Sequence, residues 1–509
     1  MKLDSKLLAA VLALAAFVCF AWIVFNSSII FGDEGYYGGN GRWMAQNAVW
    51  PSYEPLQQTA IYMRPFQKQP LFLFLNSAAW LIAGEFGIKL LLPLIAALAG
   101  LAIFVFAKDR FGSVAALAAM TVFFMANGVV TYAVLDYVEM FDVLLFVLAL
   151  HFAFKEKPKD LDLLMAGLFT GLSMLTDVTG LFLAPILLIA LLWKSRLSGI
   201  RPLIIIGMIA LLVLSPFLLR NLYFFGGFCL PGPGIMSACS IAGVPDLGVT
   251  MTLPSADSGG TSSQAITMGF ANYFNFATGF PVLIFLLFGI AALIYRRDAW
   301  YALVPWFGLF ALLTLQQSLY GGRAEDIPRY TLFGFPALAL IAGIFFADAY
   351  DFLKKYNRLL AGLLVVLLLL FAAPGMLQKL DGMKGAKTFP GGFYDACGWV
   401  RANTDSDARL FTPYQHAMSW LCDRRGYAGG EVPDVPLILS SNNDVAYERL
   451  KAHGTDYIFI PEFIVSDVAY GGTISRPFIS YMDSSSHFKM VFDNRNIYGN
   501  AGVRIYQVL

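Results

Sequence analysis

The sequence carries little charge. Only 14% of its 509 residues are Asp, Glu, Lys or Arg, whereas 58% are hydrophobic, which is outside the usual range for soluble proteins. The formal net charge is +1, so the chain has no bulk basic field that would attract nucleic acid. Internal repeats, coiled-coil heptads and low-complexity tracts are also missing. The composition predicts a polytopic membrane protein whose electrostatic function depends on where its few charges lie.

Histidine and cysteine are scarce as well. The four histidines have no metal-ligand spacing, and we interpret all of them as structural: His151, His416, His453 and His487. Cys19 lies in the first apolar segment, and the pairs Cys229/Cys239 and Cys397/Cys422 fall in segments that we place outside the cytoplasm. That placement permits two disulfides, but the sequence alone does not establish them. The cofactor requirement stays open, including the need for a divalent cation.

Long apolar runs dominate the first three quarters of the chain. The first starts near Leu7, extends for roughly 19 residues and lacks a small-x-small cleavage site, which favours a retained span with a cytoplasmic N-terminus over a signal peptide. Ten further runs are long enough to span, at 88–107, 112–132, 137–154, 162–176, 179–193, 201–219, 276–295, 299–316, 331–347 and 358–374. We therefore predict an α-helical polytopic membrane protein with about 11 transmembrane helices.

Short basic loops set the orientation. Lysine and arginine gather at 108, 155, 193, 295 and 351, and the positive-inside rule assigns these loops to the cytoplasm. The apolar segment that starts at Gln69 is only about 15 residues long, and counting it as a span would turn every later basic loop outward. We therefore predict that it lies in the membrane interface, so that the first outer loop, 26–87, contains interfacial helices.

The tail has a different composition. From about Lys384 the long apolar runs give way to short strand-like pieces, RLFTPY, DYIFI and GVRIYQVL, separated by turn-forming links. The stretch FYDACGWVRANTDSDARLF is typical of a helix, a polar break and a strand. We predict a transmembrane catalytic domain over 1–380 and a small extracytoplasmic α/β domain over 381–509.

The polar residues gather at the outer face. Under this topology the span interiors are nearly free of charge, whereas a transporter would carry ionisable groups near mid-membrane. Transfer of a sugar from a lipid phosphate to a hydroxyl needs one carboxylate base and cations for the departing phosphate, but no strong general acid. The outer loops and outer helix ends supply both kinds of group: Asp33, Glu34, Arg42, Arg64, Lys68, Asp136, Glu139, Asp142, Asp177, Arg220, Arg323 and Arg329.

Five motifs in order resemble a known group. DEGYYGGNGRWM is similar to the first-loop D-E-x-x-Y…R-x-M pattern of the GT-C superfamily glycosyltransferases, in the protein O-mannosyltransferase and lipid A aminoarabinose transferase branch. Lys68-Gln69-Pro70-Leu71 resembles its K-P-P-L, and TYAVLDYVEMFDVLL resembles its second-loop acidic motif. SPFLLRN and PRYTLFGFP resemble its later P-x-x-x-RN and RY-x₅-P signatures. The resemblance covers the whole order of elements, including a C-terminal extracytoplasmic domain.

The resemblance implies an inverting transferase that uses a polyprenyl-phosphate (dolichyl-type) sugar donor, with Asp33 as the catalytic base. We add Glu34 and Asp136 to the predicted catalytic set, although Glu34 could instead cap the following segment or pair with Arg42. Asp136 would orient the substrate or a bound cation. We predict that four basic residues bind the donor phosphate: Arg64, Lys68, Arg220 and Arg329.

Two departures from the family pattern bear on the metal site and on the group that is transferred. Gln67 stands where the aminoarabinose branch has a carboxylate associated with metal binding, and Gln69 replaces a proline, so the metal site stays unknown. The WWDYG-type signature of oligosaccharyltransferases is absent, which favours transfer of a single sugar, a hexose or pentose, to a protein, lipid or glycan hydroxyl.

Two other functional classes stay open. A transporter or flippase of polyprenyl-linked lipid would move its lipid unchanged, and a receptor or scaffold would act through its tail. For location we expect the plasma membrane of a prokaryote, although an endoplasmic reticulum membrane fits the same charge pattern. The lack of charge inside the spans disfavours the transporter, and the ordered motifs of the outer loops disfavour the scaffold.

Overall fold

The structure is a computed structural model. It describes residues 4–27, 32–56, 58–61, 66, 69–155, 157–177, 200–226, 332–427, 444–466 and 474–509, together with a few isolated positions between them. For residues 32–34 and for a few positions within later helices, the description extends to the backbone only.

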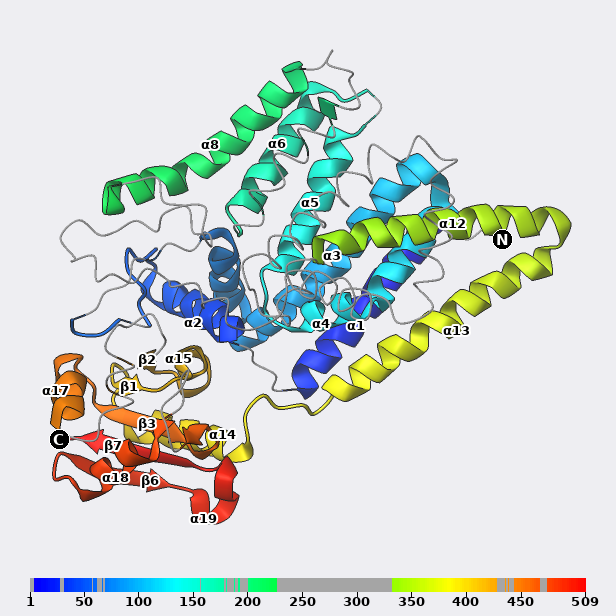
Figure 1. Cartoon of the computed structure of the whole chain (residues 1–509). Helices are drawn as coiled ribbons and strands as arrows, with labels where there is room; N and C mark the ends of the chain where they lie inside the picture. The colour runs from blue at the N-terminus through cyan, green and yellow to red at the C-terminus, as the bar shows by residue number, and fades with distance from the viewer. Residues whose placement is uncertain are drawn as a thin grey trace, which may run out of the picture.

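One long helical element forms the centre of the N-terminal part (Figure 1). Helix α3 (Leu71–Met125) packs against α1 (Ser5–Asn26) and α12 (Phe335–Tyr356), and α13 (Arg358–Met383) lies against α12. Small residues let the backbones approach closely, because a Cβ on Gly343 of α12 would lie 2.8 Å from the Ala119 Cβ of α3. These helices share one apolar core.

Helix α3 is three helices joined by two breaks. Its backbone leaves the helical region at Ala83 and Gly84 and again at Gly112, and both glycines have positive φ values, 61° and 85°. Glycine adopts these left-handed values without the steric cost that a side chain would add. The first piece ends where the predicted interfacial segment ends, and the second matches the predicted span at 88–107. The third piece and α4 (Asn127–Val134), separated by the break at Ala126, match the span predicted at 112–132.

A second group of helices follows in chain order. Helix α5 (Glu139–Ala153) packs between α3 and α6 (Asp160–Met174), and α6 packs against α8 (Ile200–Phe225). Within the described residues, four helices are long and apolar enough to cross a membrane: α1, α3, α8 and α12. The spans predicted at 276–295 and 299–316, and almost all of the one at 179–193, lie outside the described residues.

The C-terminal region (residues 391–509) holds a five-stranded sheet in the order β2-β1-β3-β7-β6. Strand β1 pairs in parallel with β2 and β3, whereas β7 pairs antiparallel with β3 and β6. The strands are β1 (Arg409–Phe411), β2 (Arg425–Tyr427), β3 (Tyr457–Pro461), β6 (Phe488–Asp493) and β7 (Val503–Val508). The strand-like pieces RLFTPY, DYIFI and GVRIYQVL contain β1, β3 and β7, as predicted.

Helices cover both faces of this sheet. Alternate residues of β3 point to opposite sides, so Ile458 and Ile460 pack with α17 (Asp444–Ala452) and α18 (Arg476–Ser484), while Phe459 packs with α14 (Gly391–Asn403). The shorter elements are α15 (Gln415–Ala417), α19 (Arg495–Tyr498), β4 (Val465–Ser466), β5 (Ile474–Ser475), the 3₁₀ turns η1 (Leu332–Gly334), η3 (Glu462–Ile464) and η4 (Gly499–Ala501), and the π-helix η2 (Met418–Cys422). The helix, break and strand predicted around 391–411 are confirmed by α14 and β1.

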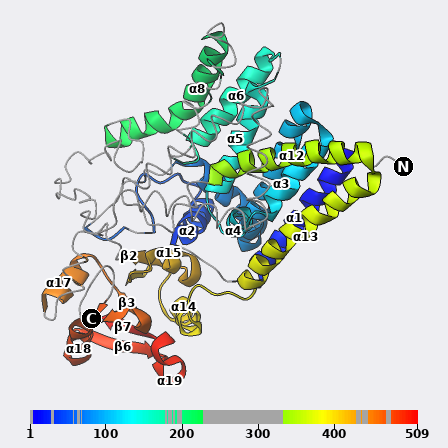
Figure 2. The ribbon, with the colours of Figure 1, turned by 45° about the vertical axis from the view of Figure 1, so that its right-hand side comes forward.

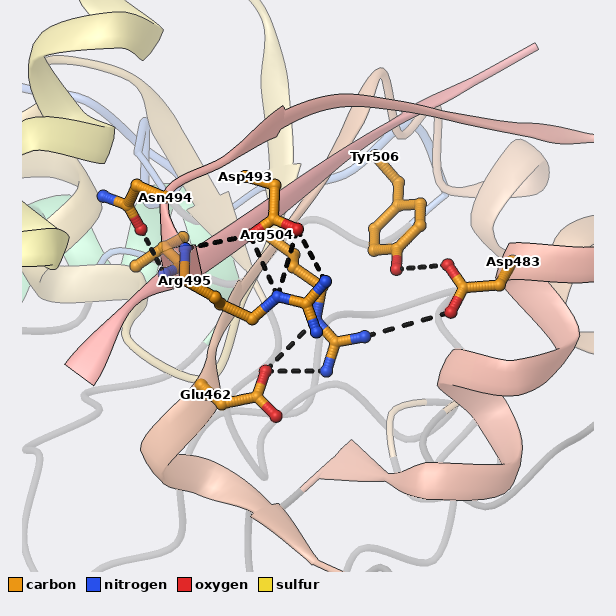
Figure 3. A network of polar contacts seen from close by, with 8 residues as sticks. Glu462, Asp483, Asp493, Asn494, Arg495, Arg504 and Tyr506 are labelled. Atoms are coloured by element: carbon orange, nitrogen blue, oxygen red, sulfur yellow. Dashed lines mark hydrogen bonds and ion pairs between the residues drawn. The ribbon is translucent and has the colours of Figure 1, made fainter. Parts of the chain in front are cut away.

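Arginine–carboxylate pairs hold the outer edge of the sheet together (Figure 3). Arg504 of β7 forms an ion pair with Glu462 at 2.6 Å, and Arg495 pairs with Asp493 at the same distance. The hydroxyl of Tyr506 donates to Asp483 at 2.7 Å, which links β7 to α18. A disulfide joins Cys397 of α14 to Cys422 of η2, whereas Cys229 and Cys239 lie outside the described residues.

Candidate active site

The DEGYY stretch forms a helix, α2 (Gly32–Asn47), despite its glycines. Glycine in a helix interior costs roughly 1 kcal/mol relative to alanine, so the helix needs support from its neighbours. That support is close packing on two sides: a Cβ at Gly38 would lie 2.9 Å from the Trp420 ring, and one at Gly41 would lie 2.5 Å from the Asn76 Cβ. Helix α2 therefore packs closely against both α3 and the C-terminal region, and both views show it lying between them (Figure 1, Figure 2).

The two predicted carboxylates begin this helix. Asp33 and Glu34 lie in the first turn of α2, and their side chains are outside the described set. Tyr36 and Tyr37 follow on the buried part of the helix. The Tyr36 hydroxyl donates to Glu54 Oε1 at 2.6 Å, and Glu54 is only 2% exposed. This bond ties the start of α2 to the segment that follows it.

Asp136 lies in the turn between α4 and α5, and both of its carboxylate oxygens are buried. Burial raises the pKa of Asp136 to about 8, and the Asn76 side chain opposes the shift. Asn76 also lies under Gly41 of α2, and the neighbouring Ser77 hydroxyl donates to the Gly41 carbonyl at 2.8 Å. The start of α3 thus brings α2 and the Asp136 turn, two of the predicted motifs, to the same place.

Further carboxylates cluster at the same end of the helices. Glu139 and Asp142 lie in the first turn of α5, and both are fully buried. Asp142 Oδ1 accepts a hydrogen bond from the Ser173 hydroxyl at 3.0 Å, which joins α5 to the end of α6. The Leu71 amide, at the start of α3, donates to the Leu175 carbonyl at 3.1 Å, close to the buried Asp177.

Arg220 lies near the end of α8 and reaches the first outer loop. Its guanidinium donates to the Phe66 carbonyl at 3.0 Å, to the Pro51 carbonyl and to the Asn221 side chain. The same group lies 4.5 Å from the centre of the Trp50 ring. Arg220 therefore holds both ends of the segment 51–66. Three other predicted phosphate ligands, Arg64, Lys68 and Arg329, lie outside the described residues, as does Gln67.

The C-terminal region covers the same loop from the other side. The Gly426 amide donates to the Leu56 carbonyl at 3.1 Å, and the Ala60 amide donates to the His453 carbonyl at 3.0 Å. His453 Nδ1 lies 2.8 Å from the Thr59 hydroxyl. The described residues between Pro51 and Phe66 thus contact α8 at both ends of this segment and the C-terminal region between them.

In comparisons of sequence, only part of the chain matches a known family profile. A search of curated protein sequences finds no match. The profile of the dolichyl-phosphate-mannose-protein mannosyltransferase family matches residues 67–219, which include Lys68 and Asp136.

Structural comparisons cover far more of the chain. ArnT from Cupriavidus metallidurans, in the apo state, superposes with a TM-score of 0.67 at 12% identity, over 98% of this chain and 97% of ArnT. The oligosaccharyltransferase AglB from Archaeoglobus fulgidus superposes with a TM-score of 0.61 at 14% identity, over 89% of this chain and 69% of AglB. The chain has a GT-C fold. The arabinofuranosyltransferase AftD from Mycobacteria shares the GT-C fold with a TM-score of 0.52 at 14% identity, over all of this chain and 40% of AftD.

The GT-C fold and the four long apolar helices make this chain an integral membrane protein, as predicted. Two of these relatives were solved with lipid phosphates: AglB with an inhibitory peptide and a dolichol-phosphate, and ArnT with undecaprenyl phosphate. Within the described part of the chain, no group of three or more His, Cys, Asp or Glu side chains is placed to hold a metal ion.

Sequence reasoning missed several residues of this site. Glu54 and Asn76 are buried polar residues that contact α2, yet neither stands in a recognisable motif. A signal for Asn76 exists, because an amide in an otherwise apolar interfacial helix needs a polar neighbour. Glu54 has no such local signal, since it lies in a short polar loop. Arg42 was noted as an outer-face cation, but its partner Asp423 is 381 positions away.

Proposed function

We propose that this protein is a glycosyltransferase that moves a single sugar from a polyprenyl-phosphate donor to an acceptor hydroxyl at the outer face of the membrane. The observation that carries the proposal is the meeting of α2, the Asp136 turn and the loop held by Arg220 at one end of a GT-C fold. The lipid phosphates bound to ArnT and AglB support the class of donor.

In this proposal Asp33 is the general base. The acceptor hydroxyl gives its proton to the Asp33 carboxylate while its oxygen attacks the anomeric carbon of the sugar. The bond from that carbon to the phosphate oxygen breaks, and polyprenyl phosphate leaves with the electron pair, so the anomeric centre is inverted. A phosphate is a stable anion, so its departure needs cations and no strong acid. Arg64, Lys68, Arg220 and Arg329 are the proposed ligands of that phosphate.

Asp136 has a different part in the proposal. With a pKa of about 8 its carboxyl is mostly protonated at neutral pH, so it can donate a hydrogen bond to an oxygen of the donor. This property fits the orienting role that the sequence predicted, and it leaves the proton transfer to the first turn of α2, where Glu34 assists Asp33.

The orientation of the chain belongs to the same proposal. The N-terminus lies in the cytoplasm, the C-terminal region lies outside it, and a prokaryotic plasma membrane is the expected location. The acceptor is a hydroxyl of a protein, a lipid or a growing glycan.

Label transfer tests the proposal directly. Membranes that contain wild-type protein or Asp33→Asn are incubated with polyprenyl-phosphate sugars labelled in the sugar, and protein, lipid and polysaccharide fractions are then counted. Label that appears in one fraction only with wild type supports transfer, assigns the base and identifies the acceptor class. If labelled donor crosses a reconstituted bilayer unchanged and no fraction gains label, the flippase class replaces the transferase.

A further inference from the structure

Arg42 of helix α2 connects three parts of the molecule. Its guanidinium pairs with Asp423 at 2.7 Å and donates to the Ser419 carbonyl, and both partners belong to the C-terminal region. The same group lies 5.7 Å from the centre of the Trp420 ring and 5.6 Å from that of Trp80, which belongs to α3. The Arg42 side chain is only 12% exposed, whereas that of Asp423 is 52% exposed, so this joint encloses the guanidinium and leaves its carboxylate partner at the surface.

The backbone of α2 lies directly against the same part of the C-terminal region. A Cβ at Gly35 would collide with the His416 carbonyl, and one at Gly39 would lie 2.7 Å from the Ser419 hydroxyl. That hydroxyl lies 3.2 Å from the Gly35 carbonyl, to which it donates. The contacts at 35, 38, 39 and 42 follow one face of a helix, so this face of α2 is fitted to η2 and α15 along about two turns.

The C-terminal side of this joint is rigidly built. Asp423 follows the π-helix η2 with a left-handed backbone (φ 56°), and its neighbour Cys422 is bonded to Cys397 of α14. Arg424, the next residue, donates to the Thr404 hydroxyl at 2.9 Å and to the Thr404 carbonyl at 2.8 Å. Asp423 is thus fixed to α14 from both sides, and it offers α2 a firm attachment.

We propose that Arg42 is a positioning residue, through which the C-terminal region sets the place of α2 and of the carboxylates in its first turn. This inference rests on the proposed function. Arg42 lies nine positions after Asp33, about 13 Å along a helix axis, so it acts through the helix and not on the reacting atoms. A tilt of α2 by about 5° at Arg42 would move the first turn by about 1 Å, a displacement that can reduce a rate about a hundredfold.

The test compares Arg42→Ala and Arg42→Lys with wild type in the full-length protein. Arg42→Ala is expected to lower kcat by about tenfold to a hundredfold while the donor KM changes by less than about twofold, because the donor site itself is intact. Arg42→Lys keeps the charge but loses the contacts with the two tryptophan rings and cannot reach both Asp423 and the Ser419 carbonyl. Its kcat should therefore lie between those of Arg42→Ala and wild type. Arg495→Ala breaks an ion pair of the same kind at the outer edge of the sheet, and should leave kcat unchanged.

Amide hydrogen exchange provides a readout that does not depend on catalysis. Arg42→Ala should raise the exchange of the amides at 35–42 while the second piece of α3 stays protected. A second pair of variants reaches the same joint without removing a charge. Gly38→Ala pushes α2 against Trp420 and should lower kcat, whereas Gly398→Ala adds its methyl group in open space on α14 and should not.

The outcomes separate this inference from the proposed function. Faster exchange in α2 together with a lower kcat supports it, and an unchanged exchange pattern or a kcat within twofold of wild type in Arg42→Ala overturns it. If wild type transfers no sugar from any polyprenyl-phosphate donor, the proposed function fails. The exchange experiment then decides the positioning alone, for which loss of α2 protection is the supporting result and no change is the refuting one.

Discussion

Carboxylates in the two halves of the molecule meet opposite conditions. In the turn between α4 and α5, Asp136 is buried beside Asn76, and burial raises its pKa to about 8. At the edge of the C-terminal sheet, Asp493 accepts from Arg495, and that bond lowers the pKa of the carboxyl. The first environment keeps a carboxyl neutral and able to donate, whereas the second keeps it charged and paired with the arginine that starts α19 (Figure 3). The contrast suggests that chemistry belongs to the helix ends and stability to the sheet.

The sharpest way to break this contrast is to neutralise the first turn of α2. Asp33→Asn should reduce transfer by about 10²- to 10⁴-fold, because the acceptor proton loses its base, and Glu34→Gln should cost less. Asp407→Asn, an exposed acid of the C-terminal region, is the matched control and should be silent. Initial rates with labelled donor measure all three, and full activity in Asp33→Asn would remove it as the base.

Removing the disulfide tests whether the C-terminal region contributes mainly to stability. Replacing Cys397 and Cys422 by serine opens a loop of 25 residues and should lower the unfolding free energy by about 3 kcal/mol. Thermal unfolding of the purified full-length protein measures the change. A double variant as stable as wild type would show that the apolar contacts of α14 alone hold η2.

Arg220 belongs to the helix-end environment, because it lies near the end of α8 and holds the segment 51–66 at both of its ends. Arg220→Lys keeps the charge but cannot serve the Phe66, Pro51 and Asn221 oxygens together, so we expect the donor KM to rise about tenfold, or about 1.4 kcal/mol. Saturation curves for the donor measure it. An unchanged KM would exclude Arg220 from the donor site and from support of the 51–66 loop.

Asp136 offers a smaller and pH-dependent effect. Because its pKa is about 8, the wild-type carboxyl is neutral below that pH and ionises above it, so transfer should fall as the pH rises past 8. Asp136→Asn mimics the neutral form; it should lose less than about tenfold at pH 7 and should lack the alkaline decline. A pH profile of kcat in both proteins is the measurement, and an alkaline decline that persists in the variant would assign it to another group.

The smallest effect should come from the sheet edge. The pKa of Asp493 is depressed in the folded protein, so its contribution to stability is present above the unfolded pKa and is lost as the pH falls through the folded one. Arg495→Ala should therefore lower the free energy of unfolding by less than about 1 kcal/mol at pH 7, which lowers the melting temperature slightly, and should change neither at strongly acidic pH. Melting curves at the two pH values would show it, and an equal loss at both would refute the ion-pair explanation.

Periodicity and composition were sufficient for the elements with strong local signals. Apolar run length predicted α1, α5, α6, α8, α12 and α13, and short strand-like pieces between turn-forming links predicted β1, β3 and β7. The helix α2 could not be derived locally, because five glycines in its first ten residues oppose a helix until neighbours on both sides fill the space that side chains would take. The same reason hides Asp423 and Asn76, whose parts in the site depend on tertiary contacts and not on a motif. Motif order, in contrast, indicated the GT-C fold correctly.

The joint at Arg42 also sets an order in time. Arg42 and Ser419 are 377 residues apart in the chain. At a synthesis rate of about 5–20 residues per second, the ribosome completes the second partner about 20 to 75 s after the first. Helix α2 therefore gains these contacts only after Ser419 and Asp423 have been made, so a nascent chain, or one truncated before them, holds the first turn of α2 without this support.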